Sequence, residues 1–254
     1  MTPENQERRS AADESSARGQ ARAFSSSSAE ANSSPSQEAP QQVHAVSRRR
    51  WWKKIMLPVV PDVVGLLVAQ GEIAEAAMTA FDEWSRRGGH VTASSVRASV
   101  EHDAYAARRE LLAALQSALS TPVDQEDLYV LSERADRVLT EAKSAVREAE
   151  VLHWSPDEHA EAMSGFLLDG VRHLLAGFRL LLKAPEQAGR EADAASEAVR
   201  HVERRYREAM ASLQEGGDLR ELLAAQELYR RYHRIAEAVV GVADRLWYAV
   251  LRGA

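Results

Sequence analysis

Apolar residues recur at steps of three and four positions along most of the chain from Pro61 onward. This spacing follows the about 3.6 residues per turn of an α-helix, so it predicts a series of amphipathic helices. The first helix should end at Gly88-Gly89, the second at Thr121-Pro122, and the third should begin after Asp124. Because the loops between these helices are short, we expect the three to pack antiparallel.

The turn from Thr121 to Asp124 combines a helix stop with a helix start. Pro122 fixes its own φ and disfavours the helical conformation at Thr121, so the second helix must end there. Asp124 should cap the third helix by accepting a hydrogen bond from the amide three residues on. Asp127 should reach back toward the cap, as in a capping box.

The second half of the chain repeats this design. Ser155-Pro156-Asp157-Glu158 predicts a fourth helix with Ser155 as its cap and Pro156 at its first position, and Pro185 should end that helix. Gly216-Gly217 should turn the chain between the fifth and sixth helices. We therefore expect an all-α bundle over 51–254, built from two consecutive three-helix units at about 61–151 and 155–252.

A short internal repeat accompanies this pattern. Glu126-Asp127-Leu128-Tyr129 is answered about a hundred residues later by Gln226-Glu227-Leu228-Tyr229, and an arginine follows each tyrosine at the fifth position. Further on the pairing slips by one residue, since Ala135-Asp136 corresponds to Ala236-Glu237. We interpret these matches as an internal repeat.

Composition narrows the class of protein. The 254 residues are 45% hydrophobic, 28% charged and only 6% aromatic, which is typical of an alanine-rich helical protein. The absence of cysteine excludes disulfides and thiolate metal sites and suits a reducing cytosol. A net charge of −6 argues against a nucleic-acid-binding body. No uncharged run approaches the roughly 20 residues that cross a bilayer, so membrane contact should be peripheral at most.

Residues 1–50 form a tail rich in Ser, Gln and Arg, with almost no aliphatic side chains. Such a segment buries too little apolar surface to offset its ordering entropy, so we expect it to be disordered and to act as a spacer or solubiliser. A basic, indole-rich segment follows: Arg48, Arg49, Arg50, Trp51, Trp52, Lys53 and Lys54. Either it contacts a partner or an anionic membrane surface, or Trp52 packs on the bundle while the cations are solvated.

The segment from Thr121 to Tyr129, preceded by Glu101-His102-Asp103-Ala104 and followed later by Tyr206-Arg207-Glu208-Ala209, resembles a known family. It is similar to the PhoU-like phosphate transport regulators that accompany low-affinity phosphate permeases. The resemblance covers roughly Trp52 to Leu251 and is strongest at the Thr-Pro-x-Asp-x-Glu-Asp-x-Tyr turn. It implies a PhoU-like helical bundle and a non-catalytic cytoplasmic regulator, which acts at the inner face of the membrane by binding an inorganic phosphate permease. Whether the protein forms a homo-oligomer stays open.

Members of that family carry acidic pairs spaced i, i+4, which place two carboxylates on one helix face where hard cations can bind. This chain retains only part of each pair, and Tyr105, Thr140 and Val199 stand where further acids would. The retained acids are Glu101, Asp136, Glu203, Glu237 and Asp244. A site assembled from them would hold a divalent metal weakly. Alternatively the acids are solvated or paired with arginine, as Asp136 could be with Arg134 or Arg137.

Motifs of catalysis are missing from the sequence. It contains no glycine-rich phosphate loop, no Gly-x-Ser-x-Gly elbow and no His-Glu-x-x-His zinc motif. Glu150 to His153 matches Glu-x-x-His once, whereas di-iron bundles need that motif on two helices. We therefore predict that the protein is not an enzyme. Three functions compete: a phosphate transport regulator, a metal- or phosphate-sensing bundle, and a generic helical adaptor at the membrane surface.

Overall fold

The structure is a computed structural model that describes residues 61–89, 103–215 and 218–253. The chain divides into two units, Met1–Ile55 and Met56–Ala254, and every described residue belongs to the second. The predictions for the tail over 1–50, for the basic segment from Arg48 to Lys54, for Gly216-Gly217 and for Glu101 lie outside the described residues.

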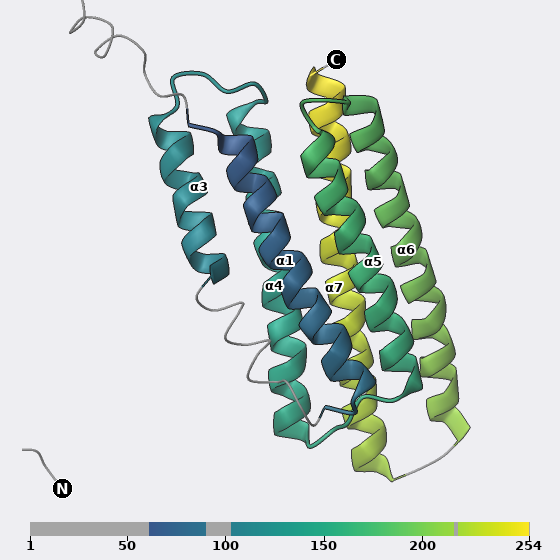
Figure 1. The fold of residues 1–254 in the computed structure, drawn as a ribbon. Helices are drawn as coiled ribbons and strands as arrows, with labels where there is room; N and C mark the ends of the chain where they lie inside the picture. The colour runs from purple at the N-terminus through teal and green to yellow at the C-terminus, as the bar shows by residue number, and fades with distance from the viewer. Residues whose placement is uncertain (1–60, 90–102, 216–217, 254) are drawn as a thin grey trace, which may run out of the picture. The chain divides into compact units, whose positions relative to one another are not determined.

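The described part of the chain is helical and contains no strand, which confirms the all-α fold class. The described residues form six α-helices (Figure 1). These helices are α1 (Val63–Arg86), α3 (Tyr105–Ser117), α4 (Gln125–Leu152), α5 (Glu158–Leu180), α6 (Pro185–Ser212) and α7 (Leu219–Gly253). A turn of 3₁₀ helix, Leu213–Glu215, extends α6.

The helices pack as the expected pair of three-helix units. Helices α1, α3 and α4 contact one another, and so do α5, α6 and α7. The two three-helix units join where α1 packs on α5 and α4 packs on α7 (Figure 1). One continuous apolar core runs through both units, so they form a single bundle. Among its fully buried large side chains are Phe81, Leu128, Leu139, Leu228 and Tyr232.

Aspartate side chains cap three of the helices. Asp124 caps α4 but accepts from the amide of Glu126, two residues on, at 2.8 Å, so the predicted partner three residues on is wrong. At α5 the cap is Asp157, which accepts from the Ala160 amide at 3.0 Å. The predictions of Ser155 as the cap and of Pro156 as the first helical residue are therefore wrong, because Asp157 already satisfies the amide of the first turn and the helix begins at Glu158.

The predicted end of the first helix holds, whereas the second and fourth helices end earlier than predicted. Helix α3 ends at Ser117, before the Thr121-Pro122 turn. Gly88 and Gly89 follow α1 with φ of 60° and 83°, a conformation that glycine adopts without a steric penalty. Helix α5 ends at Leu180, before Pro185, and Pro185 is the first residue of α6. A proline is well placed there because its missing N–H would have no partner in the first helical turn.

Helix α1 alone among the described helices is long and apolar enough, by length and composition, to cross a membrane. Buried helices of globular proteins pass the same test. In this structure α1 packs against α3, α4 and α5, and Leu67, Met78 and Phe81 are fully buried. The apolar side chains of α1 therefore contribute to the core of the bundle.

The two copies of the internal repeat lie on α4 and α7, which run antiparallel. Arg245, late in α7, lies 2.6 Å from the carboxylate of Asp127, early in α4, and Arg231, early in α7, lies 2.5 Å from Glu148, late in α4. The matching leucines of the repeat are both fully buried. The matching tyrosines differ, since Tyr229 is buried and Tyr129 is exposed.

Candidate functional site

The predicted acids are distributed over three helices. Asp136 lies on α4, Glu203 on α6, and Glu237 and Asp244 on α7. Glu237 and Asp244 are exposed, whereas Glu203 is half-buried. Within the described ranges, no three Asp, Glu, His or Cys side chains gather as a metal-binding group. The structure thus does not bring these four acids together, and the fifth, Glu101, is not described.

Asp136 is paired with an arginine, but not with either predicted partner. Arg108 of α3 donates to its Oδ2 from Nη1 at 2.7 Å, with both side chains about a quarter exposed. Arg134 instead donates to the backbone carbonyl of Gly241 on α7. The prediction of Arg134 or Arg137 as the partner is wrong, because residues one or two positions apart on a helix do not face each other, whereas Arg108 comes from the helix packed alongside.

His233 and Glu237 do contact each other on α7, as their spacing suggests. His233 Nε2 lies 3.7 Å from Glu237 Oε1, and the imidazole stacks on the ring of Tyr206 at 4.9 Å. The neighbours of this histidine are thus an aromatic ring and one exposed carboxylate.

We predict that divalent metal ions bind this protein weakly. Each acid missing from a pair removes a ligand and a charge, and Asp136 already has a cationic partner in Arg108. Calorimetric titration with Mn²⁺ should give a dissociation constant of about 10⁻⁴ M or weaker, and Asp136→Asn should leave the heats unchanged. Tight, stoichiometric binding would contradict the prediction.

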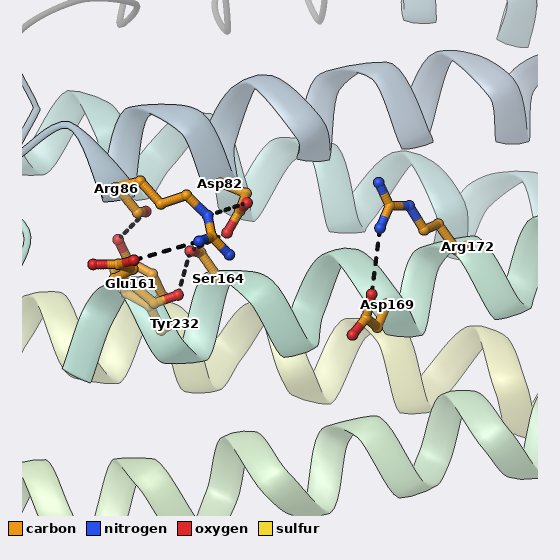
Figure 2. A network of polar contacts seen from close by, with 8 residues as sticks. Asp82, Arg86, Glu161, Ser164, Asp169, Arg172 and Tyr232 are labelled. Atoms are coloured by element: carbon orange, nitrogen blue, oxygen red, sulfur yellow. Dashed lines mark hydrogen bonds and ion pairs between the residues drawn. The ribbon is translucent and has the colours of Figure 1, made fainter. Parts of the chain in front are cut away.

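A buried polar network joins α1 to α5 and is drawn in Figure 2. Asp82 is 7% exposed, and its two oxygens accept from different donors. Arg86 Nε donates to Oδ2 at 2.7 Å, and the hydroxyl of Ser164 donates to Oδ1 at 2.7 Å. The hydrogen bond from Arg86 to Asp82 and the charge of that carboxylate raise the pKa of the guanidinium. Glu161 lies 3.4 Å from the outer side of Arg86.

A second buried contact ties α1 to α7 beside this network. The hydroxyls of Ser85 and Tyr232 lie 2.8 Å apart, and the tyrosine is fully buried. Burial raises the pKa of Tyr232, so its hydroxyl stays neutral. These residues were not predicted from the sequence, although Asp82 and Ser85 stand between apolar positions on the inward face of α1, a pattern that indicates buried polar groups. Asp82 is hydrogen-bonded to Arg86 and Ser164, and Ser85 to Tyr232. Satisfied buried polar contacts of this kind fix how the helices align.

A pocket of about 280 Å³ opens where the α3–α4 turn, the α5–α6 turn and the end of α7 meet. It lies at the Thr-Pro-x-Asp turn, the most distinctive stretch of the sequence. Its walls combine polar and apolar surface, and Asp124, Asp127 and Arg252 are its charged residues. The full lining is Pro122, Val123, Asp124, Asp127, Leu181, Leu182, Pro185, Ala249, Val250, Arg252 and Gly253.

Asp127 is the most buried charged group in this pocket, with a side chain 1% exposed. Its carboxylate pairs with Arg245 at 2.6 Å and with Arg252 at 3.6 Å, so it does not act as the predicted capping-box residue. Neither of its oxygens accepts a hydrogen bond of good geometry. The ring of Tyr248 contacts both guanidiniums, at 4.8 Å and 5.6 Å from its centroid. The internal repeat does not reveal this arrangement, because position 227, which matches position 127, is also acidic. In the structure Glu227 pairs with arginines of its own helix, whereas Asp127 pairs with arginines of another helix.

Comparison with known proteins finds a likeness in structure. No family model matches the sequence, and no curated protein gives a significant match. Among solved structures, the chain resembles a PhoU-like protein from Shewanella oneidensis MR-1 with a TM-score of 0.59 and 15% sequence identity. The likeness covers 75% of this chain and 99% of that chain. This chain therefore has the PhoU-like helical fold.

Proposed function

We propose that this protein is a non-catalytic cytoplasmic regulator of phosphate transport, and that it acts by binding an inorganic phosphate permease. The observation that carries the proposal is the PhoU-like fold, which extends over nearly the whole of the similar chain. The Thr-Pro-x-Asp-x-Glu-Asp-x-Tyr turn adds support, since it resembles that of permease-associated PhoU-like proteins and here lines a pocket at the end of the bundle.

The helical body would make the main contact with the permease. The basic segment from Arg48 to Lys54 would add a salt-sensitive contribution at the inner leaflet, because each basic residue near an anionic surface contributes on the order of 1 kcal/mol. Such contacts are screened beyond about 8 Å at physiological ionic strength. The polar groups around Asp82 are paired with one another, which agrees with a binding role for the body and offers no free nucleophile or base at that place.

Affinity capture of the full chain from its native host is expected to enrich an inorganic phosphate permease. Deletion of the gene should change phosphate uptake at low or high external phosphate. Replacement of Arg48, Arg49, Arg50, Lys53 and Lys54 by glutamine should lower recovery in the membrane fraction and flatten its dependence on salt, while the folded body stays intact by circular dichroism.

Two results together would overturn the proposal: no permease enriched by capture, and phosphate uptake in the deletion strain equal to that of the parent at every phosphate concentration. A matched control is the replacement of exposed Arg200 and Arg230 by glutamine, which removes surface cations from α6 and α7. That variant should leave membrane recovery unchanged.

A further inference from the structure

One end of the bundle gathers three exposed leucines from three separate segments. Leu119 lies in the α3–α4 turn, Leu182 in the α5–α6 turn and Leu251 near the end of α7, and they are 88%, 47% and 68% exposed. The three segments meet, because each contributes residues to the lining of one pocket. The start of α1 reaches the same end, since Pro61 lines another pocket together with the last turns of α3 (Figure 1). We call this end the turn end, and its three residues the turn-end leucines.

Exposed apolar side chains also occur at the opposite end, so exposure alone does not distinguish the two ends. There Val151, Leu219 and Leu223 are 71%, 69% and 57% exposed. Charge does distinguish them, because the α4–α5 and α6–α7 turns and the helical turns that follow contain several acids: Asp157, Glu158, Glu161, Glu215, Asp218 and Glu221. Among the described residues only Glu161 of this set has an ion-pair partner, Arg86. This end is therefore acidic, and an anionic surface would repel it.

The turn end is close to neutral. Each carboxylate in the α3–α4 turn and in the first turns of α4 and α6 lies within ion-pair distance of an arginine, which is Arg190, Arg245 or Arg252. Asp62 and Lys183 are exposed, have no ion pair within the described ranges, and carry opposite charges. An anionic surface is therefore not repelled here as it is at the acidic end.

The sequence that precedes the turn end is strongly basic. Arg48, Arg49, Arg50, Lys53 and Lys54 come before Pro61, and Lys54 does so by seven residues. A fully extended chain of that length spans at most about 25 Å. Helix α4 has 28 residues and is therefore about 42 Å long, so Lys54 cannot reach the opposite end of the bundle. The chain thus supplies positive charge to the turn end and not to the acidic end.

The arrangement of the turn-end leucines fits a lipid surface. Leu182 is followed by Lys183, and Leu251 by Arg252. Leucines enter the boundary between headgroups and acyl chains, while neighbouring cations stay with anionic headgroups. Protein hot spots are usually aromatic or arginine anchors that fill a pocket. Single exposed leucines on separate turns, each beside a cation in two cases, therefore favour a bilayer over a protein groove.

We propose that the turn end of the bundle docks on an anionic bilayer surface, with the turn-end leucines inserted at the acyl boundary and the acidic end turned away from the lipid. The basic segment from Arg48 to Lys54 supplies the electrostatic attraction. The inference rests on the proposed function only in taking the inner leaflet as the membrane. It adds the orientation of the helical body and the residues that enter the lipid.

The test uses the full chain and extruded vesicles made from an equal mixture of phosphatidylglycerol and phosphatidylcholine, with co-sedimentation as the measurement. We expect binding about tenfold or more tighter than to phosphatidylcholine alone, and weaker as salt is added. A chain that does not bind the anionic vesicles, or that binds both kinds of vesicle equally, would overturn the proposal.

Two triple variants decide which end contacts the lipid. Replacing the turn-end leucines by glutamine should weaken binding to the anionic vesicles about tenfold or more, because inserted apolar side chains contribute in proportion to the area they bury. Replacing Val151, Leu219 and Leu223 by glutamine removes comparably exposed side chains from the acidic end and should leave binding unchanged. All six positions are exposed, and circular dichroism checks that both variants fold. Equal losses in the two variants, or no loss in the first, would contradict the proposed orientation.

A lipid-sensitive dye gives an independent readout. The chain contains no cysteine, so Leu119→Cys and Leu219→Cys each create a single attachment point for the dye NBD. At position 119 the emission should shift to shorter wavelength when anionic vesicles are added, and brominated acyl chains should quench it. At position 219 the emission should not change. No change at position 119, or a larger change at position 219, would refute insertion of the turn end.

Capture of the permease distinguishes lipid from protein as the partner of the turn end. If the variant without turn-end leucines binds vesicles as the parent does but no longer enriches a permease, the turn end contacts protein and the lipid proposal is overturned. The vesicle assays contain no permease, so they succeed or fail separately from the capture experiment. Vesicle binding through the turn end without enrichment of a permease would refute the proposed function and support this inference.

Discussion

Replacing Asp127 with alanine is expected to lower the free energy of unfolding by about 3 kcal/mol or more. The side chain of Asp127 is 1% exposed and that of its main partner, Arg245, is 15% exposed. Removing the carboxylate would leave the largely buried guanidinium of Arg245 with only the exposed carboxylate of Glu126, 3.4 Å away, and its Nε already lacks a hydrogen-bond partner. Urea denaturation should show a lower midpoint with an unchanged slope.

Two further variants make this measurement specific. Glu133→Ala removes an exposed carboxylate from the same helix and should change the free energy of unfolding by no more than about 0.5 kcal/mol. The double variant Asp127→Leu with Arg245→Met replaces the buried pair by apolar side chains and should recover most of the loss. If Asp127→Ala were as stable as Glu133→Ala, the buried ion pair would contribute nothing to the fold.

The second large effect is expected at the two tyrosines of the internal repeat. Tyr229 is 2% exposed, whereas Tyr129, at the matching position, is 45% exposed. Tyr229 packs edge-on against Trp154 at 6.0 Å and donates a hydrogen bond to Asp157, the cap of α5. Burial, together with that carboxylate, raises its pKa, so the hydroxyl remains a neutral donor at physiological pH.

Tyr229→Ala should therefore lower the free energy of unfolding by about 3 kcal/mol or more, as large-to-small changes of buried aromatic residues do. Tyr129→Ala should cost about 1 kcal/mol or less, because its ring is nearly half exposed. Tyr229→Phe should lie between them, at about 1 kcal/mol, since it removes only the hydrogen bond to Asp157. Thermal and urea unfolding of the three variants provide the comparison, and equal losses at positions 129 and 229 would contradict the assigned burial.

Local features of this protein could be predicted from the sequence because they depend on residues close together in the chain. The non-helical turn around Pro122 follows from the restricted backbone of proline, although α3 already ends at Ser117, and the end of α1 follows from the freedom of Gly88 and Gly89 at positive φ. The three- and four-residue apolar spacing predicted the helices. The repeat matched Leu128 with Leu228, and in the structure both are fully buried. The all-α bundle of two three-helix units could be assembled from these elements alone.

Cap positions were less well predicted, because several neighbouring polar residues can compete for the same amides. Ser155 and Asp157 both fit a helix start, and the choice of Asp157 depends partly on Tyr229, which holds its second oxygen from another helix. Likewise Asp127 fits a capping box by sequence, but two arginines on α7 draw its carboxylate away. Two positive charges attract the carboxylate more strongly than a neutral backbone amide does.

Only the tertiary structure decided which distant side chains meet. Asp136 lies within reach of several arginines by sequence, and the packing of α3 on α4 selected Arg108. Tyr129 and Tyr229 are equivalent in the repeat, yet the Trp154 side chain and the α5 cap cover only one of them. The pocket around Asp127 arises from three chain segments that are far apart in the sequence. Helix periodicity specifies the face that a residue occupies, whereas its neighbours on that face depend on how the helices pack.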